Sequence, residues 1–87
     1  MMNAITLERV QAIVARVAGP ARSPAAPGPD TPLQEGGFWL DSASVLEVIL
    51  ACEAEFDVAF DPEMDFDEHA LRTVGTLFSL IEAKRPG

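Results

Sequence analysis

Apolar residues recur three and four positions apart near the N-terminus, which is typical of a helix with one buried face. The spacing predicts a helix over residues 6–18, with Thr6 as its N-cap. The expected buried stripe is Val10, Ile13, Val14 and Val17. Gly19 and Pro20 end this helix, because glycine accepts a left-handed backbone and proline cannot continue a helix.

A second stripe predicts a longer helix that begins at Asp41 or Ser42 and runs to about Phe56 or Asp57. The expected core-facing positions are Val45, Val48, Ile49, Cys52 and Phe56. The opposite side holds Ser42, Ala43, Leu46, Glu47, Leu50, Glu53 and Ala54. Two leucines therefore stand among polar residues on a side that should meet water.

The pattern predicts a third main helix over about residues 74–84, capped by Thr73. Its expected buried stripe is Val74, Leu77, Phe78 and Ile81. Lys84 and Arg85 suit the negative end of its dipole.

The segment 57–73 reads as irregular, because Pro62 breaks a helix. A short helix is expected around residues 65–71. Four apolar side chains of this segment are expected to point inward, namely Val58, Phe60, Met64 and Phe66.

Residues 19–40 form a long connection between the first two helices. It holds five of the seven prolines, which excludes a tight helical hairpin. Phe38, Trp39 and Leu40 are expected to pin its end to the core. No strand-like alternation occurs. We therefore predict a single domain over residues 1–87, an all-α four-helix bundle with three main helices, one short helix and this long first loop.

Charge is unevenly distributed along the chain. The formal net charge is −8, of which residues 41–70 carry −10 and the remainder +2. An acidic field disfavours nucleic acid and anionic lipid, whose binding needs cationic side chains. It favours a protein partner with a basic patch, and the alternative is a solvated face that only keeps the protein in solution.

Composition indicates a cytoplasmic protein without a membrane partner. Apolar runs are too short to span a bilayer, and the N-terminus lacks the pattern of a secretory signal. One cysteine excludes an internal disulfide and fits a reducing compartment.

Ser42 is the side chain of greatest chemical interest. A serine nucleophile needs a base, and the single histidine, His69, lies in a different acidic segment. No nucleophile elbow is present, so we predict no catalysis. Ser42 is either a plain helix cap or an accessible hydroxyl that another enzyme modifies.

Other candidate sites are weaker. Acids at positions 61, 63, 65 and 67 imitate the start of a calcium loop, but Phe66 and Arg72 replace the glycine and the bidentate glutamate that such a loop needs. Cys52 lies on the inward stripe and is expected to be an inert thiol, and His69 is expected to be solvated. The sequence shows no zinc-type cluster and no glycine-rich phosphate loop.

Leu46 and Leu50 lie one and two turns beyond Ser42 and are flanked by Glu47 and Glu53. An apolar strip among acids is typical of a surface where a partner docks. The alternative is a helix buried on both sides, for which an 87-residue chain offers little cover.

Three segments together carry a family resemblance. "DSASVLEVILACEAEFDVAF" from Asp41 onward resembles the second-helix segment of acyl carrier proteins, in which an Asp-Ser-Leu motif opens the helix and a Glu-Phe pair closes it. "LERVQAIVARVAG" is similar to the family's first helix, and "LRTVGTLFSLIEA" is similar to its last. The resemblance covers nearly the whole chain, in the right order and at the right spacing.

The resemblance implies a non-catalytic, monomeric carrier of acyl groups. Ser42 would be the attachment point of 4′-phosphopantetheine, transferred from coenzyme A by a phosphopantetheinyl transferase that Asp41 helps to recognise. The thiol of this arm carries the acyl group as a thioester. Partner-docking residues would be Ala43, Leu46, Glu47, Leu50 and Glu53. Further partners would be an acyl-loading ligase or acyltransferase and downstream biosynthetic enzymes with basic docking patches.

Four positions depart from the family pattern: Ala43 replaces the leucine after the serine, Ser44 a usual acid, Ala54 a common glutamate and Trp39 a usual glycine. They predict weak interchange with general fatty-acid synthesis enzymes. The proline-rich first loop also suggests a dedicated carrier, for a bacterial polyketide, fatty-acyl or other specialised-metabolite pathway. Two alternatives stay open, an aminoacyl or aryl carrier and an unmodified helical adaptor that uses the same acidic face.

Overall fold

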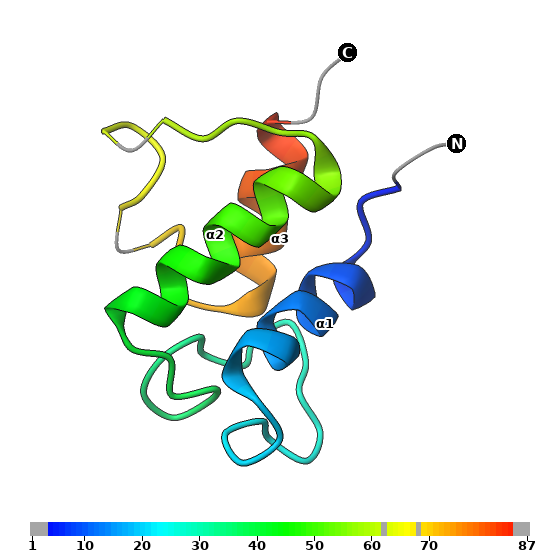
Figure 1. Cartoon of the computed structure of the whole chain (residues 1–87), viewed down its shortest axis with the longest axis vertical. Coiled ribbons are helices and arrows are strands. Elements are labelled where there is room, and N and C mark those ends of the chain that lie inside the picture. The colour runs from blue at the N-terminus through cyan, green and yellow to red at the C-terminus, as the bar shows by residue number, and fades with distance from the viewer. Residues whose placement is uncertain (1–3, 62, 68, 85–87) are drawn as a thin grey trace.

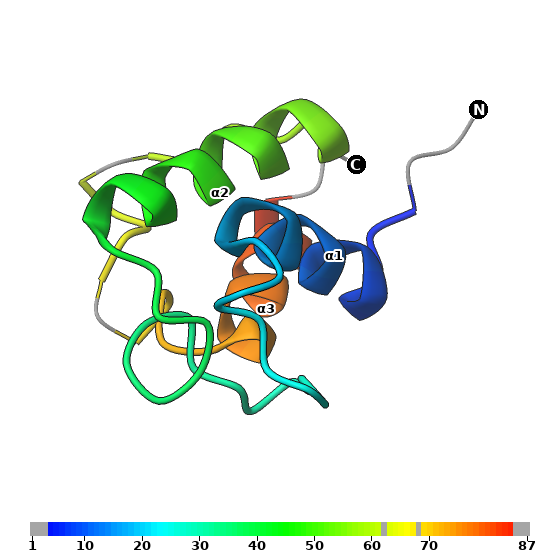
Figure 2. The same ribbon diagram turned by 60° about the horizontal axis from the view of Figure 1, so that its bottom comes forward.

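The computed structural model describes residues 4–61, 63–67 and 69–84. They form three helices, α1 (Leu7–Ala18), α2 (Ser42–Phe56) and α3 (Val74–Lys84). Helix α1 packs against both α2 and α3, and it runs opposite to α2 (Figure 1, Figure 2). The described residues contain no strand, only one isolated bridge. The predicted all-α class is confirmed.

The expected caps explain where the helices begin. Thr6 Oγ1 accepts a hydrogen bond from the Arg9 N–H at 3.1 Å at the start of α1. Thr73 and Thr76 cap α3 reciprocally, because each hydroxyl oxygen accepts from the other residue's N–H, at 3.1 and 2.9 Å. These side chains satisfy donors that have no carbonyl partner within a helix.

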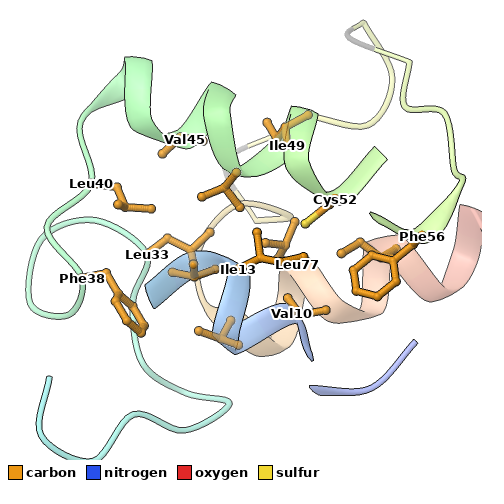
Figure 3. Packing of buried hydrophobic residues seen from close by; sticks show 14 of the residues in the cluster. Val10, Ile13, Leu33, Phe38, Leu40, Val45, Ile49, Cys52, Phe56 and Leu77 are labelled. Carbon is orange, nitrogen blue, oxygen red and sulfur yellow. The ribbon is translucent and has the colours of Figure 1, made fainter. Parts of the chain in front are cut away.

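The three helices close around one core to which the long connection also contributes. Figure 3 shows Leu33 and Phe38 of the connection directed at the same interior as Ile13 and Leu77 of the helices. The predicted stripes lie there with two exceptions, Val17 and Phe78, which are only half-buried. The fully buried side chains include Val10, Val14, Phe38, Val48, Cys52, Val74, Leu77 and Ile81.

The connection is fastened to the start of α3. Carbonyl oxygens of the connection accept hydrogen bonds from the N–H groups of Val74 and Gly75, at 3.1 and 2.8 Å. In return, the Leu33 N–H donates to the Arg72 carbonyl at 3.1 Å. The proline-rich segment thus supplies acceptors to first-turn donors of α3, and this fixes its path across the domain.

Two expectations about inward-facing side chains were wrong. Trp39 is 58% exposed although its neighbours Phe38 and Leu40 are buried, because its left-handed backbone, held by a hydrogen bond from its N–H to the Gln34 carbonyl, turns the side chain outward. Met64 is 76% exposed, because it lies in a turn closed by a hydrogen bond from the Asp65 N–H to the Asp61 carbonyl.

The short helix expected around residues 65–71 is not confirmed. The described residues of this segment form turns and bends, and position 68 lies outside them. Local side-chain bonds compete with a helix here: Asp67 Oδ1 accepts from the Ala70 N–H at 2.7 Å, and Asp65 Oδ2 accepts from the Asp61 N–H at 2.6 Å. Phe60 and Phe66 pack with their ring centroids 5.5 Å apart beneath the turns.

Candidate functional site

Ser42 is the first residue of α2 and is exposed. Asp41 precedes it as the N-cap, with Oδ1 accepting a hydrogen bond from the Ser44 N–H at 2.8 Å. Hydrogen bonds from Ser44, and then the charge of Arg22, hold the pKa of the Asp41 carboxyl below its ordinary value. Because Asp41 takes the capping role, the Ser42 hydroxyl remains free for other chemistry.

The connection holds this corner of the molecule in place. Phe38 and Leu40 are buried just before the cap, and the Leu40 N–H donates to the Leu33 carbonyl at 3.1 Å. Trp39 has a left-handed backbone with a φ of 54°, and its N–H donates to the Gln34 carbonyl at 2.8 Å. Ser42 is therefore presented by a fixed turn, not by a free loop end.

Arg22 is a residue that the sequence analysis did not single out. Its Nε donates to the Ala18 carbonyl at 2.8 Å, and a second guanidinium nitrogen donates to the Trp39 carbonyl at 3.4 Å. It thereby joins the end of α1 to the turn that precedes Ser42. The available signal was its position as the one cation among residues 19–40.

The outward side of α2 is open. Leu46 is 57% exposed and Leu50 is 63% exposed, and both Ala43 and Glu47 are exposed as well. This exposure rules out the alternative in which α2 is buried on both sides. We call Ala43, Leu46, Glu47 and Leu50 the outer face of α2.

Several acids beyond this face have partners inside the molecule. Glu53, expected on the docking side, is half-buried, and its Oε2 accepts from the Phe60 N–H at 2.9 Å. Glu55 pairs with Arg9 of α1, and Asp65 Oδ2 lies 2.9 Å from Lys84 Nζ. Part of the acidity of residues 41–70 therefore stabilises the fold, which the charge count alone could not show.

Other candidate groups lack the surroundings that chemistry would need. Cys52 is fully buried, and desolvation followed by the nearby Glu55 charge raises the pKa of its thiol to about 12, as expected for an inert residue. His69 is exposed. The described residues contain no cluster of side chains able to hold a metal ion, and among them no helix has the length and apolar character needed to cross a bilayer.

The arrangement around Ser42 suits a covalently attached anionic group. The positive end of the α2 dipole favours negative charge, and the first-turn N–H groups point toward it. The hydroxyl is exposed, so a second enzyme can approach it. The observed geometry thus fits a group that is linked through a phosphate.

Comparison with known families identifies that group. The family model described as "Phosphopantetheine attachment site" matches residues 8–81, which is most of the chain. The chain belongs to this family. No curated protein and no solved structure matched it.

Membership in the phosphopantetheine-attachment family establishes the cofactor and the general role. The domain is a site for covalent attachment of 4′-phosphopantetheine, and such carrier domains are non-catalytic. They are modified by phosphopantetheinyl transferases and interact with partner enzymes. The matched residues include all of α2 and most of α1 and α3.

Proposed function

We propose that Ser42 carries the 4′-phosphopantetheine arm and that the chain acts as an acyl carrier. The observation that carries this proposal is an exposed hydroxyl on the first residue of α2, beside a cap made by Asp41. The arm supplies a thiol on which an acyl group is held as a thioester. The protein supplies the anchoring oxygen, a favourable helix dipole at the phosphate and the surface that partners contact.

The outer face of α2 is the proposed docking surface, extended toward Glu53. Leu46 and Leu50 offer apolar contact, and Glu47 offers charge complementary to a basic patch. Glu53 lies at the edge of this surface. Its carboxylate also accepts a hydrogen bond from the Phe60 N–H, so we expect it to attract a basic partner less than Glu47 does. Asp41 helps the transferase to recognise the site. Proposed partners beyond the transferase are a loading ligase or acyltransferase and downstream enzymes.

The pathway is proposed from what the surface lacks. Three positions that general fatty-acid enzymes contact in the family are altered here. Ala43 is shorter than the usual leucine, and Ser44 and Ala54 lack the usual acidic charge. We therefore favour a dedicated bacterial polyketide, fatty-acyl or other specialised-metabolite pathway in the cytoplasm, served by a monomeric carrier. Efficient loading and elongation by ordinary fatty-acid synthesis enzymes would contradict this assignment.

Intact-mass measurement tests the attachment site. The protein is incubated with coenzyme A and a promiscuous phosphopantetheinyl transferase, and wild type is compared with Ser42→Ala. Two matched controls are Ser44→Ala in the same helical turn and Ser79→Ala on the exposed side of α3. We expect the mass of one arm to be gained by wild type and both controls, and not by Ser42→Ala.

The result separates the carrier from its rival. No mass gain by wild type would favour the helical adaptor, which uses the same acidic face without an arm. A gain that survives Ser42→Ala would place the arm on another residue.

A further inference from the structure

Trp39 combines two features that folding does not explain. Its φ of 54° lies in the left-handed region, where a bulky side chain is strained. The other non-glycine residue with positive φ among those described is Asp57, the C-cap of α2, where a left-handed residue is a normal way to end a helix. Trp39 caps no helix.

Trp39 is also 58% exposed, while the residues on either side are buried. The hydrogen bonds that hold the turn use only the backbone of Trp39: its N–H donates to Gln34 and its carbonyl accepts from Arg22. Glycine would make the same bonds without strain. A strained residue that the fold could replace is best explained by a contact outside the chain.

The position of Trp39 indicates which contact that is. It lies three residues before Ser42, on a turn that Arg22 and the buried Phe38 and Leu40 hold in place. Any enzyme that draws the Ser42 hydroxyl into its active site must cover the residues around it. Asp41 and Glu47 are exposed nearby in the sequence, so the enzyme's surface there should be basic.

We propose that Trp39 is a specificity-determining residue for the phosphopantetheinyl transferase, and that its indole fills an apolar recess bordered by basic side chains when Ser42 is being modified. This inference rests on the proposed attachment at Ser42. Tryptophan suits the role, because it is enriched among the few interface residues that carry most of the binding energy. Its fixed backbone reduces the entropy lost on binding.

Loading kinetics test the proposal. Wild type, Trp39→Gly, Trp39→Phe and the control Met64→Ala are loaded by the transferase of the native host, with product followed by intact mass. We expect Trp39→Gly to lower kcat/KM about tenfold through KM, with Trp39→Phe intermediate and Met64→Ala within about twofold of wild type. Trp39→Gly should melt close to wild type, because relief of the left-handed strain offsets the loss of the partly buried side chain.

The outcomes distinguish this inference from the proposed function. Absence of arm addition to wild type would refute attachment itself. If the arm is added normally to wild type, a KM for Trp39→Gly within twofold of wild type, or an effect confined to kcat, would refute the role of Trp39. The proposed attachment at Ser42 would then still stand. Loss of folding in Trp39→Gly would also refute the role of Trp39 in transferase binding, because the indole would then be part of the core.

An independent readout uses the fact that the chain has one tryptophan. Ser42→Ala protein labelled with 5-fluorotryptophan gives a single fluorine resonance and cannot be turned over. Addition of unlabelled transferase should shift and broaden this resonance if the indole enters the interface. An unchanged chemical shift at saturating transferase would overturn the proposal.

Discussion

Replacing Leu46 by aspartate separates the docking role of α2 from its packing role. Leu46 lies one turn beyond Ser42 on the outer face of α2 and is 57% exposed. The substitution keeps the helix and its inward stripe but puts a charge into the apolar strip. It therefore tests whether this strip serves partners or the fold.

The expected cost in stability follows from the buried fraction. A fully buried leucine contributes about 1.5–3 kcal/mol, and a little under half of Leu46 is buried, so the free energy of unfolding should fall by about 1 kcal/mol. In a domain of this size that corresponds to about 4–8 °C in Tm. Leu77→Ala is the benchmark for a core position, because Leu77 is fully buried and its truncation should cost about 2–5 kcal/mol.

The expected cost in partner binding is larger. A charge at the centre of an apolar contact should lower kcat/KM for loading by the transferase at least about tenfold, equivalent to about 1.4 kcal/mol. Circular dichroism gives the melting temperature and helicity, and intact mass gives the loading rate. Loss of cooperative folding would show that Leu46 belongs to the core. Unchanged loading kinetics would show that the outer face of α2 is not a docking surface for this enzyme.

Two further predictions concern the fold. Gly37→Ala should lower the free energy of unfolding by about 1–3 kcal/mol in urea titrations, because a Cβ there would lie 2.0 Å from the Pro32 carbonyl oxygen, whereas Gly28→Ala, with open space around it, should be near neutral. The pKa of Asp65 is held low, mainly by the Asp61 N–H and then by Lys84, so its contribution to stability is present above the ordinary pKa and is lost as the pH falls from there through the lowered pKa of the folded protein. The stability difference between wild type and Asp65→Asn should therefore shrink between about pH 5 and 2, and a constant difference would contradict this assignment.

Regular elements were the part of this structure that sequence could predict. Caps at Thr6, Asp41 and Thr73, together with the spacing of apolar residues, placed all three helices to within a residue or two. This works because capping and amphipathic periodicity act within a few residues of the chain. The exposure of Leu46 and Leu50 followed from the same periodicity.

Irregular segments were harder, because their geometry depends on distant contacts. Sequence could not show that Trp39 turns outward between two buried neighbours, since that follows from hydrogen bonds to Gln34 and Arg22. The carboxylate of Glu53 was assigned to the surface, but the path of the chain after α2 brings the Phe60 N–H to it. Even so, the glycine that the family usually has at position 39 fits the left-handed backbone found there.

The central claim, that Ser42 is the anchor of the arm, is tested most directly on protein purified from its native host. Peptide fragmentation by mass spectrometry can assign an added phosphopantetheine, with any cargo still attached, to a single residue. We predict that the group is found on Ser42 of the α2 peptide. Its assignment to Ser44 or another side chain, or a fully unmodified Ser42 while the pathway is active, would contradict the claim.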